Sequence, residues 1–200
     1  MHSPELKITG PLVAVHTGRW LGWCSFDWGI ILLCLWGAEY TRDWVFCLAA
    51  LFVIGNRLHA LGILAHDAAH YLSCRNRFLN DLLSNHLVTW PVGWTVEGYR
   101  IWHLKHHRHT GTGQDPEIEM KRETEPGWDL PLSGKNLRPL LLDILGRGIL
   151  GLLAGFVGFP PAKKWQQIGP ILYPVLLCSL LIDAGHSLAI ILFYGSFGTT

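Results

Sequence analysis

The chain has 200 residues, of which half are hydrophobic and ten are tryptophan, and its mean hydropathy is positive at +0.25. The formal net charge of +1 excludes the strongly basic surface typical of nucleic-acid-binding domains, so we expect no nucleic-acid partner. The five cysteines form no C-x-x-C pair, which argues against a zinc ribbon and a disulfide framework. Long apolar blocks and many tryptophans favour a membrane protein.

The apolar residues begin after an N-terminal arm, residues 1–21, which lacks the apolar core of a cleavable signal peptide. Two apolar runs then occupy residues 22–40 and 44–65. Each run approaches the roughly 20 residues that a helix needs to cross a bilayer. Because only a short polar turn separates them, residues 22–65 are predicted to form an antiparallel transmembrane hairpin.

Residues 66–167 differ in character, since they carry most of the charge and are punctuated by prolines. Two apolar segments within them, residues 79–94 and 140–159, are short or contain charged residues. We expect both segments to form helices that lie on the membrane surface or dip into it.

The last part of the chain, residues 168–200, predicts a second transmembrane hairpin made of residues 168–182 and 187–197. The expected fold is an all-α integral membrane protein with two hairpins, about four spans, and interfacial helices between them. All but four of the sixteen Lys and Arg residues lie within residues 66–167. Because basic residues near short loops stay in the cytosol, we expect this region and the N-terminus to face the cytosol.

Eleven histidines are present, and two groups of them have a helical spacing. His66 and His70 stand four residues apart, which places both imidazoles on one face of a helix. His103, His106 and His107 form an H-x-x-H-H triplet, whose expected number by chance is only about 0.03 for this composition. Both groups lie in the predicted cytosolic region, so the sequence predicts a shared metal site.

The type of ligand leaves several metals open, because imidazole binds iron, zinc, copper and nickel. Five histidines are more than one catalytic zinc needs and fewer than two metals need. We therefore expect two metals with further ligands elsewhere, and redox-active iron beside a bilayer, since hydrocarbon has no carbonyl or phosphoryl group for a Lewis acid to polarise.

The two histidine groups, about thirty residues apart after a hydrophobic hairpin, resemble the histidine boxes of the membrane fatty-acid desaturase superfamily. The continuation His107-Arg108-His109-Thr110 and the later pair Asp115-Pro116 are also similar to the family's pattern. The resemblance implies two non-haem irons, O2 as co-substrate, and an electron donor such as ferredoxin or cytochrome b5. It also implies a set of five iron ligands. These are His66, His70, His103, His106 and His107.

One departure from this family is large, because the family has a third H-x-x-H-H box and this sequence has only His186 after His109. We expect either an N-terminal part of a longer enzyme or a truncated, inactive relative. In the first case these 200 residues alone are expected to bind iron weakly and to be catalytically incompetent.

The leading hypothesis is a fatty-acyl desaturase, and its nearest alternative is a hydroxylase or ketolase of a lipid or carotenoid with the same site. A membrane zinc hydrolase and an inactive membrane protein are alternatives of other classes. Asp67 and Asp115 are candidates for carboxylates that orient the metal-bound imidazoles. Arg57, inside the second run, is expected to extend toward the cytosolic headgroups.

Overall fold

The computed structural model describes residues 14–124 and 164–196, and over these residues the chain is helical without strands. The predicted all-α class is confirmed for this part of the chain. Most of the N-terminal arm, the predicted surface helix at residues 140–159 and the end of the second hairpin lie outside the described residues.

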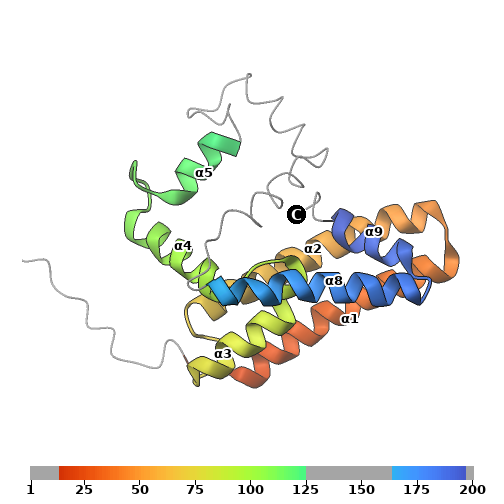
Figure 1. Ribbon diagram of the computed structural model, residues 1–200, viewed down its shortest axis with the longest axis horizontal. Coiled ribbons are helices and arrows are strands. Elements are labelled where there is room, and N and C mark those ends of the chain that lie inside the picture. Colours follow the sequence, from red (N-terminus) through yellow and green to blue (C-terminus); the bar gives the residue numbers. More distant parts are fainter. Residues whose placement is uncertain (1–13, 125–163, 197–200) are drawn as a thin grey trace, which may run out of the picture.

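The predicted first hairpin is formed by helices α1 (Thr17–Thr41) and α2 (Trp44–Ala69), which lie side by side in Figure 1. Both helices are long and apolar enough to cross a membrane. Between them, Arg42 adopts a left-handed conformation with φ of 50°, which ends α1. The Asp43 side chain then accepts a hydrogen bond from the N–H of Phe46 at 2.8 Å, which begins α2.

The two helices are antiparallel, as contacts at both ends of the hairpin show. Near the start of α1, the Nε1 of Trp20 donates to the carbonyl of Leu64, near the end of α2, at 3.2 Å. Near the turn, Gly37 lies so close to Phe46 that an added Cβ would be 2.6 Å from the aromatic ring. A side chain at this crossing would therefore require the Phe46 ring to move.

The prediction that Arg57 extends to the headgroups is wrong. Its Nη1 donates to Oδ1 of Asp27 at 3.1 Å, and only 6% of the Asp27 side chain is exposed. The guanidinium instead meets an opposite charge on the neighbouring helix, within the hairpin, and its Nη2 donates to Oδ1 of Asn56.

The segment predicted as one surface helix over residues 79–94 instead contains three short elements. They are α3 (Arg77–Ser84), the π-helix η1 (Asn85–Thr89) and the 3-10 helix η2 (Trp90–Val92). Val88 is buried in the same hydrophobic core as α1 and α2, so this segment packs against the hairpin.

Pro91 prevents a regular α-helix from resuming after η1. It has no N–H to bind the carbonyl of Leu87, which lies four residues earlier in the chain. That carbonyl accepts a hydrogen bond from Nε1 of Trp28 at 2.7 Å instead, and this bond ties the segment to α1.

A 3-10 turn, η5 (Lys164–Gln167), leads into the second hairpin, which consists of α8 (Ile168–Asp183) and α9 (Ser187–Gly195). The rings of Trp28 on α1 and Phe193 on α9 stack at 5.8 Å between centroids. Two helices joined by a short turn are present here, but α8 and α9 are shorter than the roughly 20 residues of a full span. The expected four spans therefore stay a prediction.

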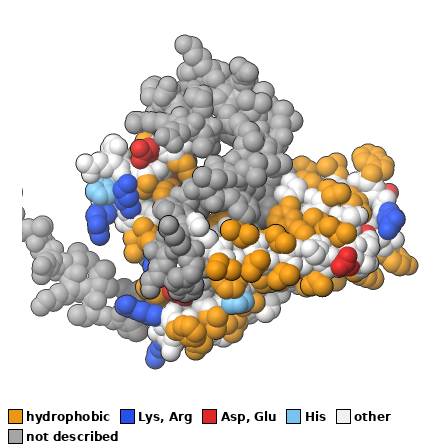
Figure 2. All heavy atoms as spheres, in the orientation of Figure 1, with side chains coloured by type: hydrophobic (Ala, Val, Ile, Leu, Met, Phe, Trp, Pro, Cys, Tyr) orange, Lys and Arg blue, Asp and Glu red, His pale blue; other side chains and the backbone are white. Residues whose placement is uncertain are grey.

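Helices α4 (Val96–His109) and α5 (Pro116–Thr124) extend away from the hairpins in Figure 1. Figure 2 shows hydrophobic side chains over much of the described hairpin surface, whereas most of the visible Lys and Arg side chains lie at the end that carries α3 and α4. The charged end is also the end where α2 finishes, at the first histidine group.

Candidate metal centre

The first histidine group lies where α2 ends. His66 is in the last turn of α2, and His70 is its C-terminal capping residue, whose N–H bonds to the carbonyls of His66 and Asp67 at 3.3 and 3.1 Å. Tyr71 then takes a positive φ of 59°, which turns the chain away. The two imidazoles consequently lie one turn apart and half-buried at the end of the helix.

The second group lies on α4, which begins at Val96 because the Thr95 hydroxyl accepts a hydrogen bond from the N–H of Gly98 at 3.1 Å. His103 and His107 are four residues apart and face α2 from this helix. His103 is buried, with 6% of the residue exposed, whereas His107 is exposed. The cluster is therefore closed on one side and open on the other.

Four of the five predicted ligands converge: His66, His70, His103 and His107. One ring nitrogen from each lies within 4.8 Å of the others. The Nε2 of His103 is 3.0 Å from Nε2 of His70 and 2.9 Å from Nε2 of His107. Two imidazole nitrogens bound to one metal at about 2.1 Å and at right angles would lie about 3 Å apart, so the arrangement fits a transition-metal ion.

The electrostatic state of the cluster also suits a metal. Burial and the neighbouring imidazoles lower the pKa of His103 to about 4, and the same causes lower the pKa of His70. A lowered histidine pKa means that the ring is neutral at any pH well above that value. Both rings therefore keep a nitrogen lone pair for a metal at neutral pH.

The fifth predicted ligand, His106, is placed outside this group of four. Its Nδ1 lies 2.8 Å from Oδ1 of Asp115 and 3.3 Å from Oε2 of Glu117. Because a carboxylate only accepts hydrogen bonds, this Nδ1 carries the hydrogen and leaves Nε2 as the metal-binding nitrogen. The side chain thus remains suited to a second metal, although the four other histidines do not surround it.

The predicted carboxylate partners have different outcomes. Asp115 is 1% exposed and contacts His106, as predicted. Burial acts to raise the pKa of Asp115, but hydrogen bonds from His106 and from the N–H groups of Glu117 and Gly111 outweigh it and lower that pKa. Asp67 is 3.8 Å from Nδ1 of His66, which is too far for a hydrogen bond, so its predicted orienting role is not seen.

Arg100, which was not among the residues predicted from the sequence, lies one helical turn before His103 and is also buried. The three-residue spacing between Arg100 and His103 could have indicated it, because residues three apart share a helix face. A buried arginine on the face that carries the histidines indicates a partner on a neighbouring element.

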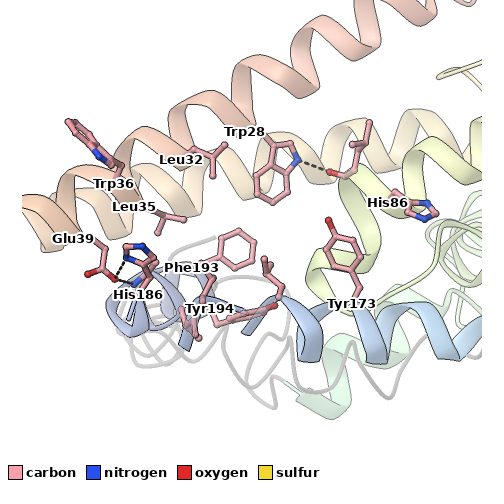
Figure 3. Close-up of a pocket in the computed structure, with 15 residues that line it drawn as sticks. Trp28, Leu32, Leu35, Trp36, Glu39, His86, Tyr173, His186, Phe193 and Tyr194 are labelled. Atoms are coloured by element: carbon pink, nitrogen blue, oxygen red, sulfur yellow. Dashed lines mark hydrogen bonds and ion pairs between the residues drawn. The ribbon is translucent and has the colours of Figure 1, made fainter. Parts of the chain in front are cut away.

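An apolar cavity of about 470 Å³ lies between α1, α8 and α9 (Figure 3). Aromatic side chains that include Trp28, Tyr173 and Phe193 line it, and Glu39 and His186 lie at one end with 4.0 Å between their nearest atoms. None of the described residues that line this cavity is one of the four clustered histidines. The cavity is therefore a separate apolar space, of the size that small ligands occupy.

Comparison with known proteins identifies the family. Residues 42–199 match the fatty acid desaturase family. The chain is 31% identical over 98 residues to an sn-1 acyl-lipid omega-3 desaturase (ferredoxin) of Nostoc sp. (strain 36). This aligned segment covers 49% of this chain and 27% of the relative. It is 38% identical over 74 residues to beta-carotene 4-ketolase 3 of Haematococcus lacustris, which covers 36% of this chain and 23% of the relative.

A third relative, the sn-1 oleoyl-lipid 12-desaturase of Anabaena variabilis, is 25% identical over 117 residues, or 55% of this chain and 33% of the relative. The chain thus matches about a quarter to a third of the length of these relatives. No solved structure matches the chain. Because the family match covers most of the chain and includes both histidine groups, the chain belongs to the fatty acid desaturase family.

Proposed function

We propose that this chain is part of a membrane-bound, O2-dependent di-iron oxidoreductase that acts on a lipid as a fatty-acyl desaturase. The observation that carries the proposal is the convergence of four imidazoles from two helices, at the end of an apolar hairpin, in a member of the desaturase family. The names of two relatives support an acyl-lipid substrate, and one of them supports ferredoxin as the electron donor. Cytochrome b5 is the alternative donor.

In this proposal, bound iron would supply the chemistry that amino-acid side chains lack, the O2-dependent oxidation of an unactivated C–H bond. His66, His70, His103 and His107 would hold the metal, and their placement on two packed helices fixes its position. Asp115 would keep the Nδ1 hydrogen of His106 in place, which would leave Nε2 available to bind a second metal. The exposed side of His107 leaves room for further ligands and for substrate.

A hydroxylase or ketolase remains the second candidate. The beta-carotene 4-ketolase of Haematococcus lacustris is more similar to this chain, at 38% identity, than the Nostoc desaturase, at 31%, although over a shorter segment. Both outcomes would use the same histidines. Only the lipid product separates them.

The test of the proposal is metal and product analysis. The full-length protein, purified from iron-supplemented membranes, is expected to contain iron, about two ions per chain at full loading. With ferredoxin, O2 and membrane lipids, it is expected to form unsaturated acyl chains. Hydroxylated or keto products would favour the second candidate, and bound zinc without O2 consumption would contradict an oxidoreductase.

We propose further that the protein is a multi-pass membrane protein with its histidines on the cytosolic side. The basic residues of α3 and α4 support this orientation, since translocating them would be costly. A cysteine at Gly113 is expected to react only when a membrane-impermeant thiol reagent reaches the cytosol, whereas one at Thr41 should react from the opposite side. Both positions are exposed in the structure. The five native cysteines require replacement first, and reversed labelling would reject the orientation.

A further inference from the structure

The buried side chain of Arg100 joins the two histidine groups. Arg100 lies on α4 one turn before His103, and only 8% of the residue is exposed. Burying a guanidinium is costly unless all of its charge and donors are matched. The groups that bind this side chain therefore show which parts of the fold it holds together.

Two of these partners are carbonyls at the end of α2. The Nε of Arg100 donates to the carbonyl of Ala69 at 2.9 Å, and its Nη2 donates to the carbonyl of Ala68 at 3.1 Å. These carbonyls belong to the last turn of α2, which immediately precedes His70. A cation at a helix C-terminus satisfies free carbonyls and interacts favourably with the helix dipole. Arg100 thus caps the helix that presents the first histidine group.

The remaining partners hold the guanidinium in place. Asp81 on α3 accepts from Nη2 at 2.6 Å and from Nη1 at 3.3 Å, and the Tyr71 ring lies beneath the guanidinium carbon at 3.9 Å. Asn80 donates to the carbonyl of Ala68 at 2.9 Å and to Asp81 at 3.0 Å, which fixes the carboxylate. Asp81 also offsets a positive charge that would otherwise oppose a cation bound at the neighbouring histidines.

We propose that Arg100 is a positioning residue for the metal centre, because it locks the end of α2 onto α4 and thereby sets the distance between His70 and His103. The inference rests on the proposed function. Only arginine suits this place, since its planar group donates in three directions at once, toward two carbonyls and a carboxylate. Lysine would keep the charge and lose this geometry.

The test compares metal binding by Arg100→Lys with that by Arg77→Lys, using Co²⁺ as the probe and the whole chain purified in detergent. Arg77 is the matched control, because its guanidinium also lies over the Tyr71 ring, at 4.8 Å, but the residue is exposed. Arg100→Lys is expected to weaken Co²⁺ binding about 10–100-fold and to change the visible absorption of the bound ion, which reports its coordination geometry. Arg77→Lys should bind as the unsubstituted chain does.

A second variant separates positioning from folding. The pair Arg100→Met and Asp81→Leu removes both charges, and replacing a buried ion pair with apolar residues is often neutral for stability. This double variant should melt near the temperature of the unsubstituted chain and still bind Co²⁺ weakly. Normal Co²⁺ binding in either Arg100 variant would overturn the positioning role while leaving the proposed function intact. Failure of the unsubstituted chain to bind Co²⁺ would overturn both.

Discussion

Replacing His103 with alanine is expected to lower metal binding by more than about 100-fold, beyond the range seen for groups that only support a ligand. His103 is the central member of the cluster, since its Nε2 lies within 3.0 Å of ring nitrogens from both His70 and His107. Its removal would leave no imidazole between His70 on α2 and His107 on α4. The metal content of the purified full-length protein and its O2-dependent lipid turnover measure the effect.

The matched control is His109→Ala, because His109 lies on the same helix and outside the group of four. It should retain metal and turnover. Membrane insertion should be normal for both variants, since the apolar residues of α1 and α2 remain unchanged. A normal iron content in His103→Ala would contradict the assignment of the cluster as the metal centre.

Replacing Asp27 with leucine is expected to lower the free energy of unfolding by about 3 kcal/mol. The substitution leaves the guanidinium of Arg57 without its partner inside the hairpin, where the two groups are 3.1 Å apart. The value is at the low end of the usual range for breaking a buried ion pair, because 26% of the Arg57 side chain is exposed and can reach other polar groups. Reversible unfolding in detergent, followed by circular dichroism, measures the change.

Two further variants test the cause of this loss. Combining Asp27→Leu with Arg57→Met removes both charges and should restore most of the stability, since the unpaired charge is responsible. Arg42→Met removes an arginine from a pair with Glu39 at 4.0 Å, but the Arg42 side chain is 75% exposed, so this change should cost less than about 1 kcal/mol. If Asp27→Leu unfolds with the same free energy as the unsubstituted chain, the pair is not structural.

Local patterns in the sequence were sufficient for the helical class, the first hairpin and both histidine groups. The length of an apolar run and the turn at Arg42 and Asp43 depend only on neighbouring residues, as does the presence of two imidazoles on one face of a helix. The family could also be recognised, because its histidine spacing is local to each helix. These features therefore did not require knowledge of the packing.

Tertiary structure decided which side chains meet. The sequence placed His106 with the other ligands, yet the turn after α4 brings Asp115 to its Nδ1, and that contact depends on the path of the chain beyond the helix. The partner of Arg57 lies thirty residues away on α1, so no local pattern could name it. Arg100 reaches the end of α2 only because α3 and α4 fold back against it. Helical periodicity determines the face on which a residue lies, whereas the packing of helices determines what that face contacts.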